Sequence, residues 1–98
     1  MAVNGAVNFL LEARTRAAAR GDADALFDLG MLCSTGSGGV AVDMIAAHKW
    51  FNLAAVSGHA AAAAARAEVA DDMSAREVAE AQRQARAWLG ATRAKRAA

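Results

Sequence analysis

The chain contains no proline, no tyrosine and a single cysteine, and it has only two tryptophans and three phenylalanines in 98 residues. Because β-branched residues are also few and scattered, the composition favours helices over strands and predicts an all-α fold. The lone cysteine, Cys33, excludes a disulfide within the chain. At this length we expect one domain, covering residues 1–98.

Long apolar runs are missing as well. No span of about twenty apolar residues occurs, and no basic residue precedes the short apolar run near the beginning of the sequence. The sequence therefore predicts neither a membrane helix nor a secretory signal, and we expect a cytoplasmic protein. The net charge of +1 gives no global electrostatic argument for binding nucleic acid.

What the sequence does have is alanine, which supplies more than half of its hydrophobic residues. Alanine is the best helix former but buries little area, so the core must consist of closely spaced helices anchored by a few large side chains. The candidate anchors are Phe9, Leu10, Leu11, Leu26, Phe27, Leu29, Leu32, Ile45, Trp50, Phe51, Leu53, Val78, Trp88 and Leu89.

Glycines and capping residues divide the sequence into five expected helices. They cover residues 4–20, 22–35, 43–57, 59–72 and 74–92. Gly21 and Gly58 are placed to end helices, Asp43 to cap one, and Ser74 with Glu77 to form a capping box. Because the connections are short, we expect consecutive helices to be antiparallel.

A weak internal repeat begins at the two glycines that are placed to end helices. The segments GDADA at Gly21 and GHAAA at Gly58 each follow an alanine-rich helix end and open another helix, thirty-seven residues apart. A period between twenty and fifty residues is typical of stacked helix pairs.

The segment between these glycines resembles the Sel-one-like repeat, an α/α relative of the tetratricopeptide repeat. The positions that carry the resemblance, in order, are Gly21, Asp22, Ala25, Leu29, Gly30, Gly36, Gly38, Asp43, Ala47, Trp50, Phe51, Ala54, Ala55 and Gly58. Two positions depart from the family pattern. Cys33 replaces an aromatic residue near the end of the first repeat helix, and Gly39 is an extra residue in the loop, which predicts that this loop is the most mobile internal connection.

The resemblance implies a short right-handed α/α solenoid of about five antiparallel helices. Residues 1–20 would be half a repeat, 21–58 a full repeat, 59–92 a partial repeat with a capping helix, and 93–98 a basic tail. It also implies a non-catalytic adaptor that binds another protein, often in bacterial regulation or signalling. The expected contact residues on the inner surface of the stack are Asp24, Phe27, Asp28, Met31 and Arg66.

The sequence contains few residues in patterns that would predict a catalytic or cofactor-binding site. The glycine loop follows an expected helix rather than a strand, and its first lysine, Lys49, lies ten residues beyond Gly39, so a phosphate-binding loop is not predicted. His48 is expected to be solvated and His59 to begin a helix, and with Cys33 they lack zinc-ligand spacing. We expect no enzyme activity, no metal and no cofactor.

Two further hypotheses stay open. Arg83, Arg86, Arg93, Lys95 and Arg96 follow Glu80 with no further acidic residue, so the basic C-terminal tail could bind an anion or nucleic acid, although nucleic acid is the less favoured partner. Self-association is the other hypothesis, because a short helical stack leaves apolar faces open at its ends.

Overall fold

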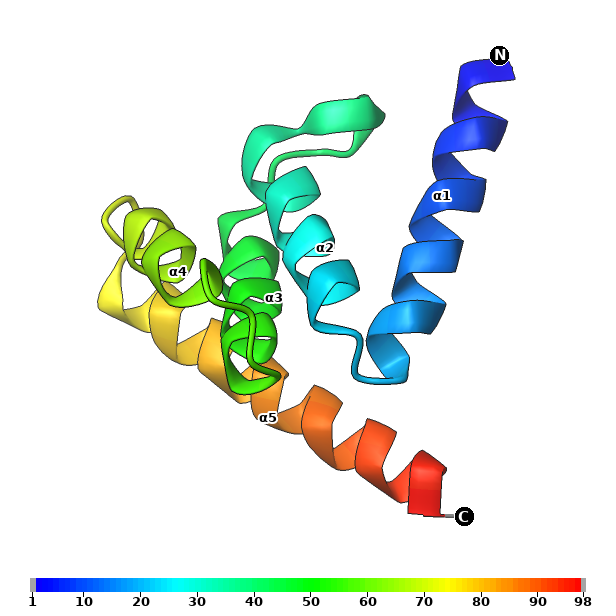
Figure 1. Ribbon diagram of the computed structural model, residues 1–98. Helices are drawn as coiled ribbons and strands as arrows, with labels where there is room; N and C mark the ends of the chain where they lie inside the picture. Colours follow the sequence, from blue (N-terminus) through cyan, green and yellow to red (C-terminus); the bar gives the residue numbers. More distant parts are fainter. Residues whose placement is uncertain (1, 98) are drawn as a thin grey trace.

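The computed structural model describes the backbone of residues 2–97 and the side chains of residues 9–95. All regular structure in this part is helical, which confirms the all-α prediction. The elements are α1 (Ala2–Ala19), α2 (Ala23–Thr35), the short 3₁₀ turn η1 (Ser37–Gly39), α3 (Met44–Val56), α4 (Ala62–Ala70) and α5 (Ala75–Ala97) (Figure 1). No helix among the described residues combines the length and apolarity needed to cross a membrane.

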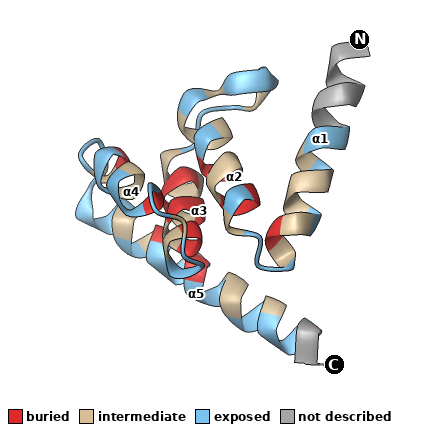
Figure 2. Cartoon of the chain, in the orientation of Figure 1, coloured by how far each residue is buried: buried red, intermediate tan, exposed pale blue. Residues whose placement is uncertain are grey.

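Helix α3 is the centre of the fold, because it packs against α2, α4 and α5. The buried residues gather accordingly on α2 and α3 (Figure 2). Leu29, Phe51 and Leu53 are the largest fully buried side chains, and all three were expected as anchors. Trp50 on α3 meets Trp88 on α5 edge to face, with ring centroids 4.8 Å apart, an arrangement that aromatic pairs prefer.

Alanines let the helices approach closely, as the composition predicts. Four of them have no exposed surface at all: Ala47 and Ala54 on α3, Ala62 on α4 and Ala81 on α5. Alanine loses almost no side-chain entropy on burial, so these contacts bring helices together at little cost.

Two expected core residues on α1 are instead exposed. Phe9 is 65% and Leu10 54% exposed. The reason is that α1 packs mainly on α2, and the two helices meet at the turn that joins them and diverge from there (Figure 1). Among the α1 side chains that the structure describes, only Ala18, close to that turn, is buried, so Phe9 and Leu10 keep contact with water.

Side-chain caps fix three helix starts where the sequence predicts them. Asp22 accepts a hydrogen bond from the Ala25 N–H, 3.1 Å away, and Asp43 accepts one from the Ala46 N–H. Ser74 and Glu77 form the reciprocal capping box: the Ser74 N–H donates to Glu77 Oε1 and the Glu77 N–H to Ser74 Oγ. These bonds satisfy backbone donors that the first helical turn leaves free.

The two glycines of the internal repeat lie in the same kind of turn. Both have positive φ, 87° at Gly21 and 96° at Gly58. The Gly21 N–H donates to Ala18 O and the next N–H to Ala17 O, and the Gly58 N–H donates to Ala55 O and the next to Ala54 O. This pair of bonds is the Schellman motif, so the two sites end their helices identically.

Two expected helix boundaries are wrong. Helix α4 begins at Ala62 rather than at His59, because His59 Nδ1 accepts a hydrogen bond from the Ala61 N–H and holds a turn there. Helix α5 continues to Ala97, so residues 93–97 extend the helix instead of forming a separate tail. Alanines and cations suit such a helix end, because cations offset the negative pole of its dipole.

Candidate functional site

An open groove lies between α2 and α4 and has a volume of about 270 Å³. We call it the α2–α4 groove. It is lined by Met31, Ser34 and Thr35 of α2, Met44 and Phe51 of α3, Ala65, Glu68 and Val69 of α4, and Asp72. Helices that belong to different parts of the sequence therefore form its two walls, and α3 supplies the floor.

The floor of the groove is formed by the buried ring of Phe51. Phe51 is 1% exposed and packs in one apolar cluster with Ala47 and Val69. Its ring lies against Gly30 of α2, so closely that a Cβ there would meet ring carbons at 2.5 Å. Phe27 adds a tilted ring contact to Phe51 at 5.3 Å between centroids.

The two rims of the groove differ in charge. The α2 rim carries the hydroxyls of Ser34 and Thr35, whereas Glu68 and Asp72 stand on the other side. Both acidic residues are exposed, and neither takes part in an ion pair within the described residues. No lysine or arginine lines the groove, so its potential is negative.

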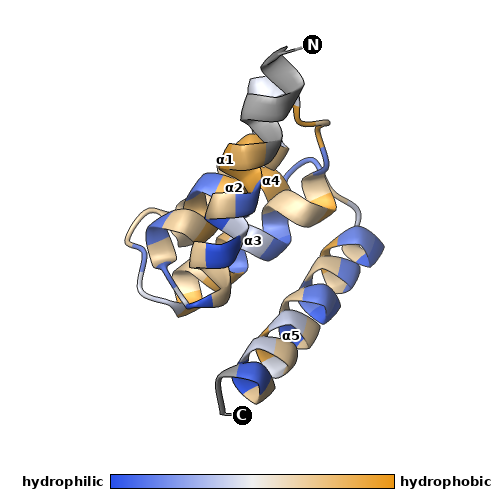
Figure 3. Cartoon of the chain, turned by 90° about the vertical axis from the view of Figure 1, so that its right-hand side faces the viewer, coloured by the Kyte–Doolittle hydropathy of each residue, from blue (hydrophilic) through white to orange (hydrophobic). Residues whose placement is uncertain are grey.

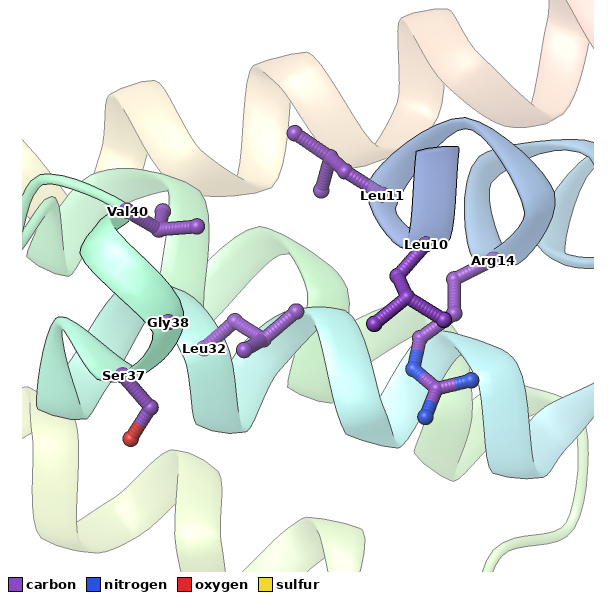
Figure 4. Close-up of a pocket in the computed structure, with 7 residues that line it drawn as sticks. All are labelled: Leu10, Leu11, Arg14, Leu32, Ser37, Gly38 and Val40. Carbon is purple, nitrogen blue, oxygen red and sulfur yellow. The ribbon is translucent and has the colours of Figure 1, made fainter. Parts of the chain in front are cut away.

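A second, smaller pocket opens on the other side of α2, between α1 and the glycine loop (Figure 4). We call it the α1–α2 cleft, and its volume is about 100 Å³. It is lined by Leu10, Leu11 and Arg14 of α1, Leu32 of α2, Ser37 and Gly38 of η1, and Val40. The α1 residues lie on one side and the loop residues on the other, with Leu32 between them (Figure 4).

The glycine loop was expected only to connect two helices. That its residues also line this cleft was not predicted. Gly36 ends α2 with φ 72°, and Gly38 and Gly39 have φ 66° and 83°. The three positive angles fold the loop back over the end of α2, which places Ser37 and Val40 opposite Leu10.

Three of the five expected contact residues lie on or beside the α2–α4 groove. Met31, 43% exposed, lines it. Phe27 stacks flat on His59, with ring centroids 4.1 Å apart, and Asp24 Oδ1 lies 3.6 Å from His59 Nε2. The stack on His59 was not anticipated, because it depends on the turn that holds this histidine ahead of α4.

The other two expected contact residues have partners within the chain. Asp28 pairs with Arg14 of α1 at 3.6 Å, and it lines one open pocket with Asp24 and another with Met31. Arg66 donates a hydrogen bond to Asn52 Oδ1 on α3 at 2.5 Å. A shared binding surface of the five residues stays a prediction.

His48 is buried, 3% exposed, and not solvated as expected. The expectation failed because three helices surround α3, so faces away from Trp50 and Phe51 are covered too. His48 Nδ1 has no hydrogen-bond partner within the described residues. Burial lowers the pKa of His48 from its ordinary value, and the nearby charge of Arg66 lowers it further, which leaves the imidazole neutral.

The C-terminal ends of α1 and α5 form a third, basic pocket. It is lined by Arg16, Ala19 and Arg20 with Thr92 and Lys95, and its volume is about 260 Å³. The lining contains three cations and no acidic residue, and cations suit the negative pole of a helix end. We call this pocket the α1–α5 basic pocket.

Nucleophilic and metal chemistry have no assembled site in the described part of the chain. No three His, Cys, Asp or Glu side chains there are placed to hold a metal ion. Burial raises the pKa of the Cys33 thiol, and the charge of Asp43 raises it further, which disfavours the thiolate that acts as nucleophile. Lys49 lies over the Trp50 ring, 4.2 Å from its centroid.

Comparison of the chain with protein-family models, curated proteins and solved structures gives no match. The structural features that bear on function are the α2–α4 groove, the α1–α2 cleft and the α1–α5 basic pocket.

Proposed function

We propose that this chain is a non-catalytic protein-binding module. In this proposal it is a short right-handed α/α solenoid of the Sel-one-like type with antiparallel helices, and it works in the cytoplasm as a bacterial regulatory or signalling adaptor. The observation that carries the binding role is the α2–α4 groove, an open concave site in which the 43% exposed Met31 lies between two helices. Concave sites that combine apolar side chains with a few polar groups are typical of binding sites.

Two structural features support the repeat architecture in this proposal. The turns at Gly21 and Gly58 have the same hydrogen bonds thirty-seven residues apart. Gly30 and Phe51, two positions of the family pattern, fit against each other. Such a contact lets α2 and α3 pack closely as the two helices of one repeat.

Capture of proteins from a bacterial lysate tests the binding role. We expect the immobilised chain to retain specific proteins at modest salt, and Met31→Lys to lose them, because the new cation would occupy the groove. The matched control is Val56→Lys, since Val56 is also exposed, 62%, but does not line the groove. Equal capture by the two variants, or no specific capture under several conditions, would contradict the proposal.

The α1–α5 basic pocket favours a second candidate function, the binding of an anion or of nucleic acid. Arg16 and Lys95 come from helices at opposite ends of the chain and line the same pocket, so the basic residues near the C-terminus do not act alone. Because residues 93–97 are helical, substitution tests this idea better than truncation.

Fluorescence anisotropy with a single-stranded oligonucleotide separates the two functions. If the basic pocket binds phosphates, the affinity should fall steeply with salt. The double substitution of Arg16→Gln with Lys95→Gln should then reduce the slope of log binding constant against log salt concentration. The expected reduction is about 0.7 for each phosphate that the variant no longer neutralises. Absence of binding at low salt, or a slope that the double variant leaves unchanged, would remove this candidate.

A further inference from the structure

Helix α4 is held in place by few buried side chains. It packs mainly on α3, and only two of its nine residues, Ala62 and Val69, are buried. No side chain caps its start, and a helix this short is not stable in water without packing. Helices α2 and α5 each contact α3 directly, so the packing of these three helices does not depend on α4.

The face of α3 that meets α4 contains a buried imidazole. His48 and Asn52 lie one turn apart on the same face of α3, and Asn52 Oδ1 accepts the hydrogen bond from Arg66 of α4. His48 is 3% exposed, and its Nδ1 has no hydrogen-bond partner within the described residues. A buried polar atom without a partner costs stability, and a buried charge without a partner costs more.

The charges around His48 oppose its protonation. Helices α2, α4 and α5 pack against α3. Of the charged side chains that the structure describes on them, only Arg66 affects the pKa of His48, and it lowers this pKa in addition to burial. The carboxylates of these helices and of the turn after α4 make no such contribution; they belong to Asp24, Asp28, Glu68, Asp71, Asp72, Glu77 and Glu80. A protonated His48 would therefore lie beside a cation with no carboxylate to pair with it.

From this arrangement we propose that protonation of His48 releases α4 from α3, while α2, α3 and α5 stay packed. Because α2 and α5 hold α3 in place, α3 cannot turn the imidazole outward. Movement of α4 separates the imidazolium from Arg66 and lets water reach it. The turn before α4 is the hinge, because Gly58 has φ 96° and His59 stays stacked on Phe27.

The pH range of this release follows from the direction of the pKa change. Closed α4 keeps the pKa of His48 below its ordinary value of 6.5, whereas open α4 lets the imidazole titrate as it does in water. The closed form is therefore fully favoured above that value and is lost as the pH falls. The equilibrium constant for opening rises by at most about tenfold per pH unit. Release also removes the α4 wall of the α2–α4 groove.

Amide hydrogen exchange of the full chain at about pH 7 and about pH 5 tests the proposal. Protection factors, which remove the pH dependence of intrinsic exchange, should be lower in α4 than in α2 and α3, because α4 opens before the whole fold does. In α4 they should fall about tenfold from the higher to the lower pH. His48→Leu should abolish the fall. Arg66→Gln should reduce it, because the neighbouring positive charge is removed.

Val69→Ala is the matched control for a general loosening of α4. Val69 is 7% exposed and packs with Ala47 and Phe51, so its truncation weakens the contact between α4 and α3 without changing a charge. Protection of α4 in this variant should fall by the same factor at both pH values. Circular dichroism verifies that each variant keeps its helical content.

Three results would overturn the proposal. Protection of α4 equal to that of α2 and α3 would show that α4 opens only with the whole fold. Protection that is lower in α4 but independent of pH would show that its opening leaves His48 buried. An acid response that persists in His48→Leu would assign the effect to another group, such as His59, whose Nδ1 holds the turn before α4. No partner takes part in this measurement, so none of these results bears on the proposed function.

Discussion

Phe51 of α3 lies on the backbone of Gly30 of α2, at a distance that leaves no room for a side chain. A Cβ on Gly30 would be 2.5 Å from both Cδ1 and Cε1 of the Phe51 ring, and Phe51 is buried on its other sides. This contact joins the two helices and fixes the floor of the α2–α4 groove.

Gly30→Ala should therefore destabilise the protein. Overpacking a core costs about 1–3 kcal/mol, while replacing glycine by alanine in a helix returns about 1 kcal/mol, so we expect a net loss of up to about 2 kcal/mol in the free energy of unfolding. Gly90→Ala is the control, because Gly90 lies in α5 with no atom near the added Cβ. It should stabilise the chain by about 0.5–1 kcal/mol. Urea denaturation that gave both variants the same sign would contradict the packing argument.

His48 should make stability depend on pH. The fold keeps its imidazole neutral and lowers its pKa from the ordinary value of 6.5. Below that value the unfolded chain binds a proton that the folded chain does not, so stability is fully present above it and is lost as the pH falls. The slope approaches about 1.4 kcal/mol per pH unit.

The measurement is urea denaturation between about pH 7 and about pH 5, a window above most carboxyl titrations. His48→Leu removes the titrating group and the unpartnered Nδ1, so it should flatten the dependence without a large loss at neutral pH. A variant as pH-dependent as the wild type would show that His48 is not responsible.

Gly36 and Gly39 should respond differently to the same substitution. Both have positive φ, which costs an alanine about 1–2 kcal/mol. At Gly36 the new Cβ would also lie 2.9 Å from Val42 Cγ2 and 3.2 Å from Val40 O, whereas nothing lies within 4 Å at Gly39. Gly36→Ala should therefore be the more destabilising by about 1–3 kcal/mol. Equal thermal midpoints for the two variants would refute this reasoning.

The capping box of α5 predicts a cost for Ser74→Ala. Loss of the bond from the Glu77 N–H to Ser74 Oγ should lower the free energy of unfolding by about 1 kcal/mol. Ser57→Ala is the matched control, because Ser57 is exposed and its hydroxyl caps nothing. The cap would have no energetic role if both variants unfolded at the same urea concentration.

Local signals were enough to predict that the chain is all-helical and where most of its helices begin and end. The caps at Asp22, Asp43 and Ser74 and the glycine at Gly21 depend on neighbours a few residues away, so sequence spacing reveals them. Buried Phe51 also follows from helical periodicity, since its face repeats in α3.

The features that the sequence could not predict depend on which helices pack against one another. His48 is buried because α3 has neighbours on three sides, and Leu10 is exposed because α1 diverges from α2. The same holds for the site: Met31 shares a groove with Glu68, but Arg66 turns toward Asn52. Hydropathy along the chain (Figure 3) does not distinguish these positions, because the exposed Leu10 and the buried Leu29 are equally apolar.

The mobility of the glycine loop stays a prediction. The extra residue Gly39 predicts that this loop is the most mobile internal connection, and amide hydrogen exchange measures that property. Exchange at residues 37–40 should be faster than in the turns at Gly21 and Gly58. Slower exchange there would show that closure of the α1–α2 cleft holds the loop.

Site-specific photo-crosslinking tests the central claim, protein binding through the α2–α4 groove, most directly. A photoreactive amino acid replaces Met31 in one sample and Val56 in the other, two exposed apolar positions of which only the first lines the groove. After irradiation in a bacterial lysate, position 31 should form crosslinks to a discrete protein. Crosslinks of equal yield at both positions, or none at position 31, would contradict the account.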